Sequence, residues 1–147
     1  MPLIRTASLL AALTLALGTA HAQTDPLAAA AAEPGAEVKP SGLVFRVLKP
    51  GNGASPAATD TVKVHYRGTF PDGREFDSSH KNGGPIEFPL NRVIKCWTEG
   101  VQRMKVGGKA KLTCPPTIAY GERGAGNVIP PNATLHFEVE LLAIGQR

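Results

Sequence analysis

Two segments far apart in the chain alternate strictly between apolar and polar side chains, and this pattern limits the fold more than any other feature. Residues 61–67 read Thr-Val-Lys-Val-His-Tyr-Arg, and residues 134–141 read Thr-Leu-His-Phe-Glu-Val-Glu-Leu. A period of two places one set of side chains in a core and the other toward solvent, as in a half-buried strand. We expect two such strands, the later one central in an antiparallel sheet.

Further elements follow from shorter patterns. Residues 109–114 alternate as well, and residues 43–48 form a plausible additional strand. Asp72-Gly73 favours a hairpin turn after the first strand. Apolar residues at helical spacing predict one short helix over residues 93–106, ended by Gly107-Gly108. One helix among antiparallel strands predicts an α+β domain in which the helix packs across a curved sheet.

All aromatic side chains fall within the same part of the chain. No convincing pair of nucleophile and base, and no metal-binding cluster, accompanies them, so we expect a pocket that acts by binding and no metal site. The chain has eight aromatic residues: Phe45, Tyr66, Phe70, Phe76, Phe88, Trp97, Tyr120 and Phe137.

The N-terminus has the pattern of an export signal. An apolar run from Ala7 to Leu17 follows Arg5 and leads to Ala20-His21-Ala22, an Ala-x-Ala cleavage pattern. The run is much shorter than the roughly 20 residues of a membrane-spanning helix. We therefore expect a signal peptide over 1–22 and a periplasmic or secreted protein without stable membrane association; the alternative is a short anchor that is never cleaved.

The next stretch predicts a separate segment. Residues 23–40 are rich in alanine and proline and contain no aromatic residue, which is typical of a flexible linker. A single folded domain is expected over residues 41–147. The formal net charge of +4 is mildly basic, but the cations are scattered among acidic residues and glycines, so we expect no nucleic-acid function.

Five segments together resemble the FKBP-type peptidyl-prolyl cis-trans isomerases, and the resemblance covers residues 42–147. It implies a curved antiparallel β-sheet half-wrapped around one short α-helix, an apolar pocket for a proline ring, and no cofactor. The segments are His65-Tyr66-Arg67-Gly68, Glu75-Phe76-Asp77-Ser78-Ser79, Val93-Ile94 through Trp97, Ala119-Tyr120-Gly121, and Val128-Ile129-Pro130-Pro131 running into residues 132–137.

The resemblance also implies roles for individual residues. Asp77 is expected at the pocket edge, with the Tyr120 hydroxyl and the Ile94 N–H as hydrogen-bond donors to substrate carbonyls. Trp97 is expected as the pocket floor. The other residues expected to bind substrate are Tyr66, Phe76, Phe88, Val93, Ile129 and Phe137.

The implied activity is rotation about X-Pro peptide bonds during the folding of exported proteins. That barrier is about 18–20 kcal/mol, and desolvation and shape can lower it without a covalent intermediate. Implied partners are proline-containing or unfolded polypeptides and macrolides such as rapamycin, and we expect a monomer. The alternatives are a proline-peptide binding module or a holding chaperone without essential turnover. Without the resemblance, Trp97 would be interpreted as an ordinary core residue and Asp77 as a turn residue. We interpret His65 and His136 as surface histidines and not as metal ligands or bases.

The chain departs from the family pattern beside the expected floor. Lys95-Cys96 stands where many members carry Pro-Gly, and Cys114 is the only other cysteine. In an exported protein this pair predicts a disulfide; the alternative is two free, partly buried thiols. Ile86 at the pocket rim and the loop containing Ala125 and Asn127 also differ from well-known members, so rim specificity is expected to change.

Overall fold

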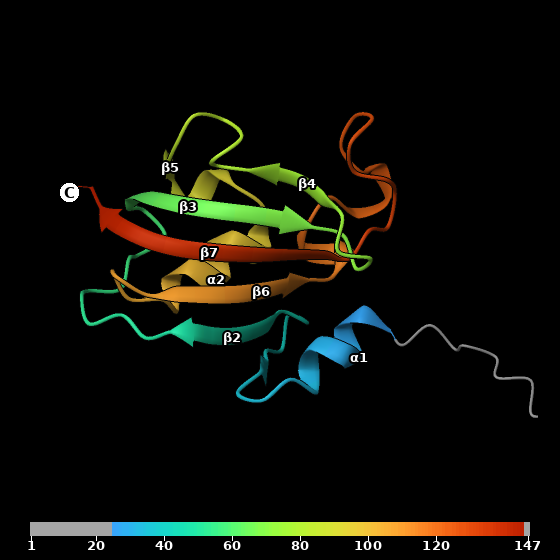
Figure 1. The fold of residues 1–147 in the computed structure, drawn as a ribbon, viewed down its shortest axis with the longest axis horizontal. Coiled ribbons are helices and arrows are strands. Elements are labelled where there is room, and N and C mark those ends of the chain that lie inside the picture. The colour runs from blue at the N-terminus through green and yellow to red at the C-terminus, as the bar shows by residue number, and fades with distance from the viewer. Residues whose placement is uncertain (1–24, 146–147) are drawn as a thin grey trace, which may run out of the picture.

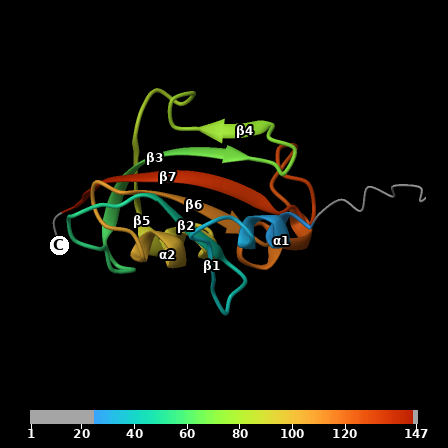
Figure 2. The ribbon, with the colours of Figure 1, turned by 60° about the horizontal axis from the view of Figure 1, so that its bottom comes forward.

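The computed structural model describes residues 25–145, which form one curved antiparallel sheet with a short helix on its concave side (Figures 1 and 2). Seven strands pair in the order β1-β2-β6-β7-β3-β4, and β5 also pairs with β3. The strands are β1 (Glu37–Val38), β2 (Val44–Lys49), β3 (Thr61–Thr69), β4 (Glu75–Ser78), β5 (Ile86–Pro89), β6 (Lys109–Cys114) and β7 (Leu135–Ile144). The helices are α1 (Pro26–Ala31) and α2 (Lys95–Gln102), with 3-10 turns η1 (Leu90–Arg92), η2 (Pro116–Ile118) and η3 (Gly121–Arg123).

The two alternating segments form the centre of the sheet, as predicted. β7 lies between β6 and β3, and pairs antiparallel with both. Val62 and Val64 of β3 and Val139 and Leu141 of β7 are fully buried. Their period of two therefore covers one face of the sheet with core side chains and confirms the predicted α+β fold class.

The α2 helix crosses the concave face of the sheet (Figure 2). Its Trp97 and Val101 side chains are buried in the core. It is shorter than the predicted 93–106: Ile94 is its N-cap and Arg103 its C-cap. The predicted stop at Gly107-Gly108 was wrong, because Gly107 adopts a positive φ of 89° in a separate turn that leads into β6. Met104 is buried although it lies beyond the helix, so its match to the helical spacing made the helix look longer than it is.

A single glycine allows α2 to approach the sheet closely. A Cβ atom at Gly100 would overlap the Leu112 side chain of β6. This contact fixes the distance of the helix from the sheet.

The hairpin turn between β3 and β4 forms where Asp72-Gly73 predicted it. The N–H of Gly73 donates to the Phe70 carbonyl at 2.9 Å, and Gly73 has φ 88°. The Asp72 carboxylate accepts from the Arg74 N–H at 2.9 Å. Both features are typical of turns that use Asp and Gly.

Residues 25–40 differ from the predicted flexible linker. Asp25 caps α1 by accepting from the Leu27 N–H, Ala30 of α1 is buried, and β1 pairs with β2. Glu33 accepts from Arg46 at 2.7 Å and from Lys111 at 2.6 Å. The composition did not predict this, because the pairing of β1 and the contacts of Glu33 join the segment to β2 and β6 and leave no local sequence pattern. Residues 23 and 24 and the predicted signal peptide lie outside the described residues.

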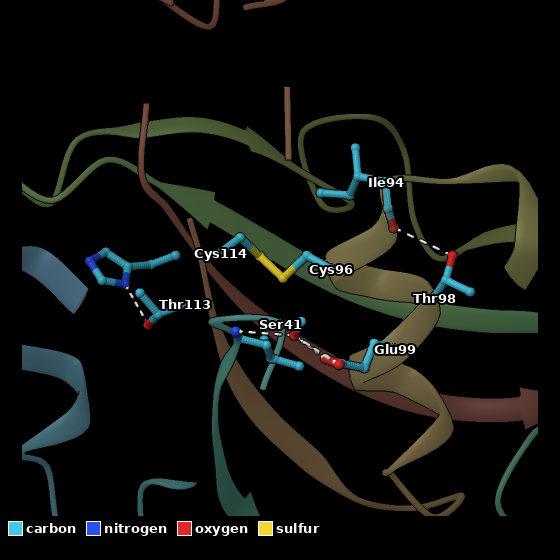
Figure 3. The surroundings of a disulfide bond; sticks show 9 residues. Ser41, Ile94, Cys96, Thr98, Glu99, Thr113 and Cys114 are labelled. Atoms are coloured by element: carbon cyan, nitrogen blue, oxygen red, sulfur yellow. Dashed lines mark hydrogen bonds between the residues drawn. A yellow bond between two sulfur atoms is a disulfide. The ribbon is translucent and has the colours of Figure 1, made fainter. Parts of the chain in front are cut away.

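The predicted disulfide is present and joins the start of α2 to the end of β6 (Figure 3). Cys96 and Cys114 are both fully buried, with Cα atoms 5.8 Å apart. On the same helix, Glu99 accepts a hydrogen bond from Ser41 at 2.8 Å. The helix is thus attached to β6 by a covalent bond and to the segment before β2 by a hydrogen bond. No helix within residues 25–145 is long and apolar enough to cross a membrane.

Candidate functional site

A pocket of about 550 Å³ opens between the concave face of the sheet and the N-terminal half of α2. This volume lies within the roughly 300–1,000 Å³ of typical ligand sites, and most of the lining is apolar. Strands β3, β4, β5 and β7, helix α2 and the η1 and η2–η3 regions all contribute. The lining residues are Tyr66, Phe76, Asp77, Ile86, Arg92, Val93, Ile94, Trp97, Tyr120 and Phe137.

Trp97 forms the floor and is held by other rings. Its indole packs edge-on against Tyr66 and Phe137, with ring centroids 5.2 and 5.3 Å apart. Phe88 packs against it from a further side at 5.4 Å. Such edge-to-face arrangements are the preferred geometry of aromatic pairs, and they leave Trp97 only 6% exposed. The floor is therefore rigid, and its shape is preformed.

Gly68 on β3 makes room for the pocket wall. A Cβ atom at this position would lie 2.8 Å from Cε2 of Phe76 and 3.0 Å from Cε1 of Phe137. Those two rings pack edge-on at 5.6 Å directly beside it. Any larger residue would displace the rings, so Gly68 helps to form the site. The sequence places Gly68 in the first segment of the family resemblance but does not indicate this role.

A polar network lies at one edge of the pocket. The Tyr66 hydroxyl donates to Oδ2 of Asp77 at 2.6 Å, and the Ser78 N–H donates to Oδ1 at 2.9 Å. Asn82 adds two contacts: its Nδ2 donates to Oδ1 of Asp77 at 2.8 Å and to the Tyr66 hydroxyl at 3.3 Å. Donors on several sides thus fix the orientation of the Asp77 carboxylate.

Both phenols at the site hold their protons. Burial, followed by the hydrogen bond and the charge of Asp77, raises the pKa of Tyr66 to about 12. Burial and the charge of Asp77 also raise the pKa of Tyr120. Both hydroxyls are therefore hydrogen-bond donors over the physiological pH range and do not act as bases.

The indole nitrogen of Trp97 is buried and has no hydrogen-bond partner among the residues that the structure describes. An unsatisfied buried donor costs about 1–3 kcal/mol. The floor thus combines an apolar ring with one unsatisfied N–H. Within residues 25–145, no group of three or more His, Cys, Asp or Glu side chains is arranged to hold a metal.

The structure brings most of the sequence-predicted site residues together. Asp77, Tyr120 and Ile94 line the pocket, as do Tyr66, Phe76, Val93, Trp97 and Phe137. Phe88 packs against Trp97, and Ile129 is buried in the core; neither is among the residues that line the pocket.

Sequence reasoning missed Arg92 and Asn82. Arg92 lines the pocket from η1. Asn82 reaches Asp77 through a loop that reverses the chain after β4, with Gly83 and Gly84 at positive φ. The neighbouring Gly-Gly pair marked the turn, but it did not indicate which side chain would return to the carboxylate.

Comparisons with known proteins agree with this geometry. Residues 53–142 match the family described as FKBP-type peptidyl-prolyl cis-trans isomerase. FkpA of Aeromonas hydrophila is 58% identical over 118 residues, 80% of this chain and 44% of its own length. The FKBP-type 22 kDa peptidyl-prolyl cis-trans isomerase of Escherichia coli is 59% identical over 104 residues, 71% of this chain and 50% of its own.

Solved structures are similar as well. The crystal structure of FkpA from Escherichia coli has a TM-score of 0.78 at 47% identity, covering 80% of this chain and 55% of the other. A peptidyl-prolyl cis-trans isomerase from Pseudomonas syringae has a TM-score of 0.77 at 40% identity, covering 82% of this chain and 89% of the other.

The chain spans about half the length of the curated relatives it matches. The family match itself includes most of the described sheet, α2 and the residues that line the pocket. The chain therefore belongs to the family of FKBP-type peptidyl-prolyl cis-trans isomerases.

Proposed function

We propose that this chain catalyses the cis-trans isomerisation of X-Pro peptide bonds in exported polypeptides. The observation that carries the proposal is the preformed aromatic pocket, one edge of which consists of Asp77, its donors and the protonated Tyr120. A proline ring is apolar and its nitrogen carries no hydrogen, so it enters such a pocket without leaving a donor unsatisfied.

The proposed mechanism relies on differential binding. Transfer of the prolyl amide into the apolar pocket removes water that stabilises its planar, charge-separated form. The twisted transition state has less charge separation, so it loses less solvation free energy than the ground state and the barrier falls. Trp97 lies under the ring, while Tyr66, Phe76, Val93 and Phe137 surround it. Phe88 acts indirectly by holding Trp97, and Ile129 by supporting the core beneath the loop.

Hydrogen bonds hold the peptide on both sides of the rotating bond. The Tyr120 hydroxyl donates to one substrate carbonyl and the Ile94 N–H to another, since N–H groups at the start of a helix have no intrahelical acceptor. Asp77 sets the electrostatic edge of the pocket and holds Tyr66 in place. Each tenfold in rate requires about 1.4 kcal/mol of preferential transition-state binding. No cofactor or proton transfer takes part.

The export signal pattern over 1–22 and the buried disulfide support a periplasmic or secreted location. In this proposal residues 41–147 are the isomerase domain and residues 25–40 a docked extension. The substrates are proline-containing or unfolded polypeptides, and macrolides such as rapamycin occupy the same pocket. The protein acts as a monomer, without nucleic acid.

Proline-limited refolding of a model protein tests the proposal. The uncatalysed phase takes about 10–100 s, and catalytic amounts of the chain should shorten it. Asp77→Ala combined with Tyr120→Phe should remove most of the acceleration while the variant stays folded. An unchanged rate would disprove the residue roles. If the wild-type chain binds the unfolded model protein but does not accelerate its refolding, the chain is a binding module or holding chaperone.

A second assay addresses the rim. Isomerisation of short X-Pro peptides with X varied should show a preference that follows contacts with Ile86, which departs from the family pattern, and with Arg92, which lines the pocket from η1. Equal rates for all residues X would exclude rim selection while leaving the isomerase proposal intact.

A further inference from the structure

A second hollow lies at the other end of α2 from the aromatic pocket. We call it the basic groove and define it by Phe45, Val47, Lys49, Arg103, Met104 and Lys105. Its volume is about 220 Å³, below the roughly 300–1,000 Å³ of small-molecule sites. Phe45 and Met104 are buried and form an apolar floor. The groove has room for one or two side chains.

The basic groove borders an open stretch of sheet edge. β2 pairs with β6 on one side, while on the other β1 reaches only Val44 and Phe45. Within residues 25–145, the stretch 46–49 has no strand neighbour on that side, and Figure 1 shows α1 lying away from this end of β2. Val47, which lines the groove from this edge, is 53% exposed. Such an edge presents backbone groups that can pair with an added strand.

The rim of the basic groove carries three positive charges that form no ion pair within residues 25–145. Lys49, Arg103 and Lys105 are exposed, and none forms an ion pair with a residue that the structure describes. Lys109 also borders the groove, but its ammonium lies 3.9 Å from Glu138. The hydrogen bond from Lys39, at 2.6 Å, and the charge of Lys39 lower the pKa of Glu37, and the charge of Arg103 adds a smaller effect in the same direction.

The geometry points to a second polypeptide-binding site, at which an extended, acidic segment adds to the free edge of β2. Side chains on the same face of a strand are two residues apart, about 6.6–6.8 Å. An apolar side chain of the segment fills the floor over Phe45 and Met104, and acidic side chains two positions away face Lys49, Arg103 and Lys105. The segment needs no proline, so the site is independent of the proposed isomerase activity.

Two other occupants fit less well. A second copy of the chain would bring the same basic edge against itself, and like charges at a strand edge oppose pairing. Residues 1–24 of the chain contain no aspartate or glutamate to complement the rim. An acidic, apolar segment of another polypeptide is the occupant whose charge and spacing match.

The test uses a fluorescein-labelled octapeptide of threonine residues in which one leucine has a glutamate two positions away on each side, so that all three side chains lie on one face of the strand, and a control peptide in which lysine replaces glutamate. Fluorescence anisotropy should show binding of the acidic peptide, weakening as salt rises, and at least tenfold weaker binding of the control. Amide shifts in NMR spectra should concentrate at Val47, Lys49 and Lys105. Shifts confined to the residues around Trp97, or equal binding of both peptides, would overturn the proposal.

Charge-reversed variants provide the matched comparison. Lys49→Glu, Arg103→Glu and Lys105→Glu together should weaken acidic-peptide binding at least tenfold, whereas Lys63→Glu, Arg74→Glu and Lys81→Glu together should leave it within twofold. The milder Lys49→Gln, Arg103→Gln and Lys105→Gln set covers the case in which reversal unfolds the protein. Equal binding by wild type and the groove variants would disprove the site.

An isomerisation assay and sedimentation distinguish the remaining possibilities. The groove variants should isomerise short X-Pro peptides like wild type, so loss of peptide binding with retained isomerisation supports the second site and leaves the proposed function unaffected. Sedimentation that shows a dimer through this edge, without binding of the acidic peptide, would identify a second copy as the occupant and overturn the proposal.

Discussion

At the scale of single residues, the site depends on how firmly Asp77 is held. Its carboxylate accepts hydrogen bonds from Tyr66, the Ser78 backbone and Asn82. Tyr66 and the backbone are fixed by strands β3 and β4, whereas Asn82 approaches from a loop and is exposed. Asn82 is therefore the member of this network that can be removed without disturbing the sheet.

We expect Asn82→Ala to lower kcat/KM for X-Pro peptides about fivefold, because losing one hydrogen bond to the carboxylate corresponds to roughly 1 kcal/mol. The melting temperature should remain near that of wild type. The neighbouring Lys81→Ala change removes a side chain without contact to Asp77 and serves as the control. Equal kcat/KM in all three proteins would show that Asn82 does not position the carboxylate.

The sequence predicted individual residues best where a strand pattern fixes their direction. The alternation of β3 and β7 was sufficient to direct Val64 and Val139 into the core. The resemblance supplied Asp77 and Tyr120. Asn82 could not be predicted, because a loop with glycines at positive φ sets the direction of its side chain and no periodicity constrains it.

At the scale of elements, the disulfide carries the attachment of α2 to β6. It closes a loop between residues 18 apart in sequence, and both cysteines are fully buried. Cys96 directly precedes Trp97, so the covalent bond also limits how far the pocket floor can move. Gly100 against Leu112 supplies the second point of close approach.

Replacing both cysteines, Cys96→Ala with Cys114→Ala, should lower the free energy of unfolding by about 3 kcal/mol, as expected for a loop of this size. Urea unfolding measures the change. A reductant should reduce the stability of wild type and leave the double variant unaffected. A loss below about 1 kcal/mol would mean that packing, and not the cross-link, holds α2 in place.

The extension over residues 25–40 has a different kind of anchor. Glu33 bridges Arg46 of β2 and Lys111 of β6, and β1 adds only two residues to the sheet. We expect Glu33→Gln to speed hydrogen exchange of the α1 amides severalfold while the core amides of β7 stay protected, because partly exposed ion pairs contribute about 1 kcal/mol or less. Lys39→Gln, at an exposed pair outside this bridge, is the control. Unchanged hydrogen exchange in α1 would show that the burial of Ala30 and the pairing of β1 are enough to hold the extension on the domain.

Elements with regular periods were predicted closely, and those without them were not. β6 has the bounds that the alternation gave, because its pattern ends where the strand ends. The α2 helix was predicted too long, since Met104 continues the apolar spacing after the backbone has left the helix. The α1–β1 extension was missed because its contacts are long-range and leave no local pattern.

At the scale of the whole molecule, acid should destabilise the fold in two windows. Burial, followed by the charge of Lys111, lowers the pKa of His136, while the charge of Glu33 acts in the opposite direction. Below about pH 6.5, His136 therefore binds a proton in the unfolded chain but stays neutral in the folded protein. The free energy of unfolding falls with pH until the lower pKa of the folded state is reached. The pKa of Glu33 is lowered from 4.5, mainly by its hydrogen bond with Lys111. The stability that Glu33 contributes is therefore lost only on further acidification.

The first window can be isolated with His136→Asn, which retains a side-chain nitrogen or oxygen near Oγ1 of Thr113. The free energy of unfolding, measured by urea at several pH values, should fall less steeply between pH 7 and 5 in the variant than in wild type. His80→Asn, in an exposed loop, should keep the wild-type slope. Parallel slopes for wild type and His136→Asn would exclude this histidine as the cause.

The position of β7 has a consequence for the order in which the protein matures. It is the central strand, it supplies Phe137 to the pocket, and it follows every other described strand along the chain. During synthesis from the N-terminus, β6 and β3 cannot be joined into one sheet until β7, which lies between them, has emerged. The pocket wall that contains Phe137 is also incomplete until then. The chain should thus have no aromatic pocket while it is being synthesised, and should gain the pocket in a single late step.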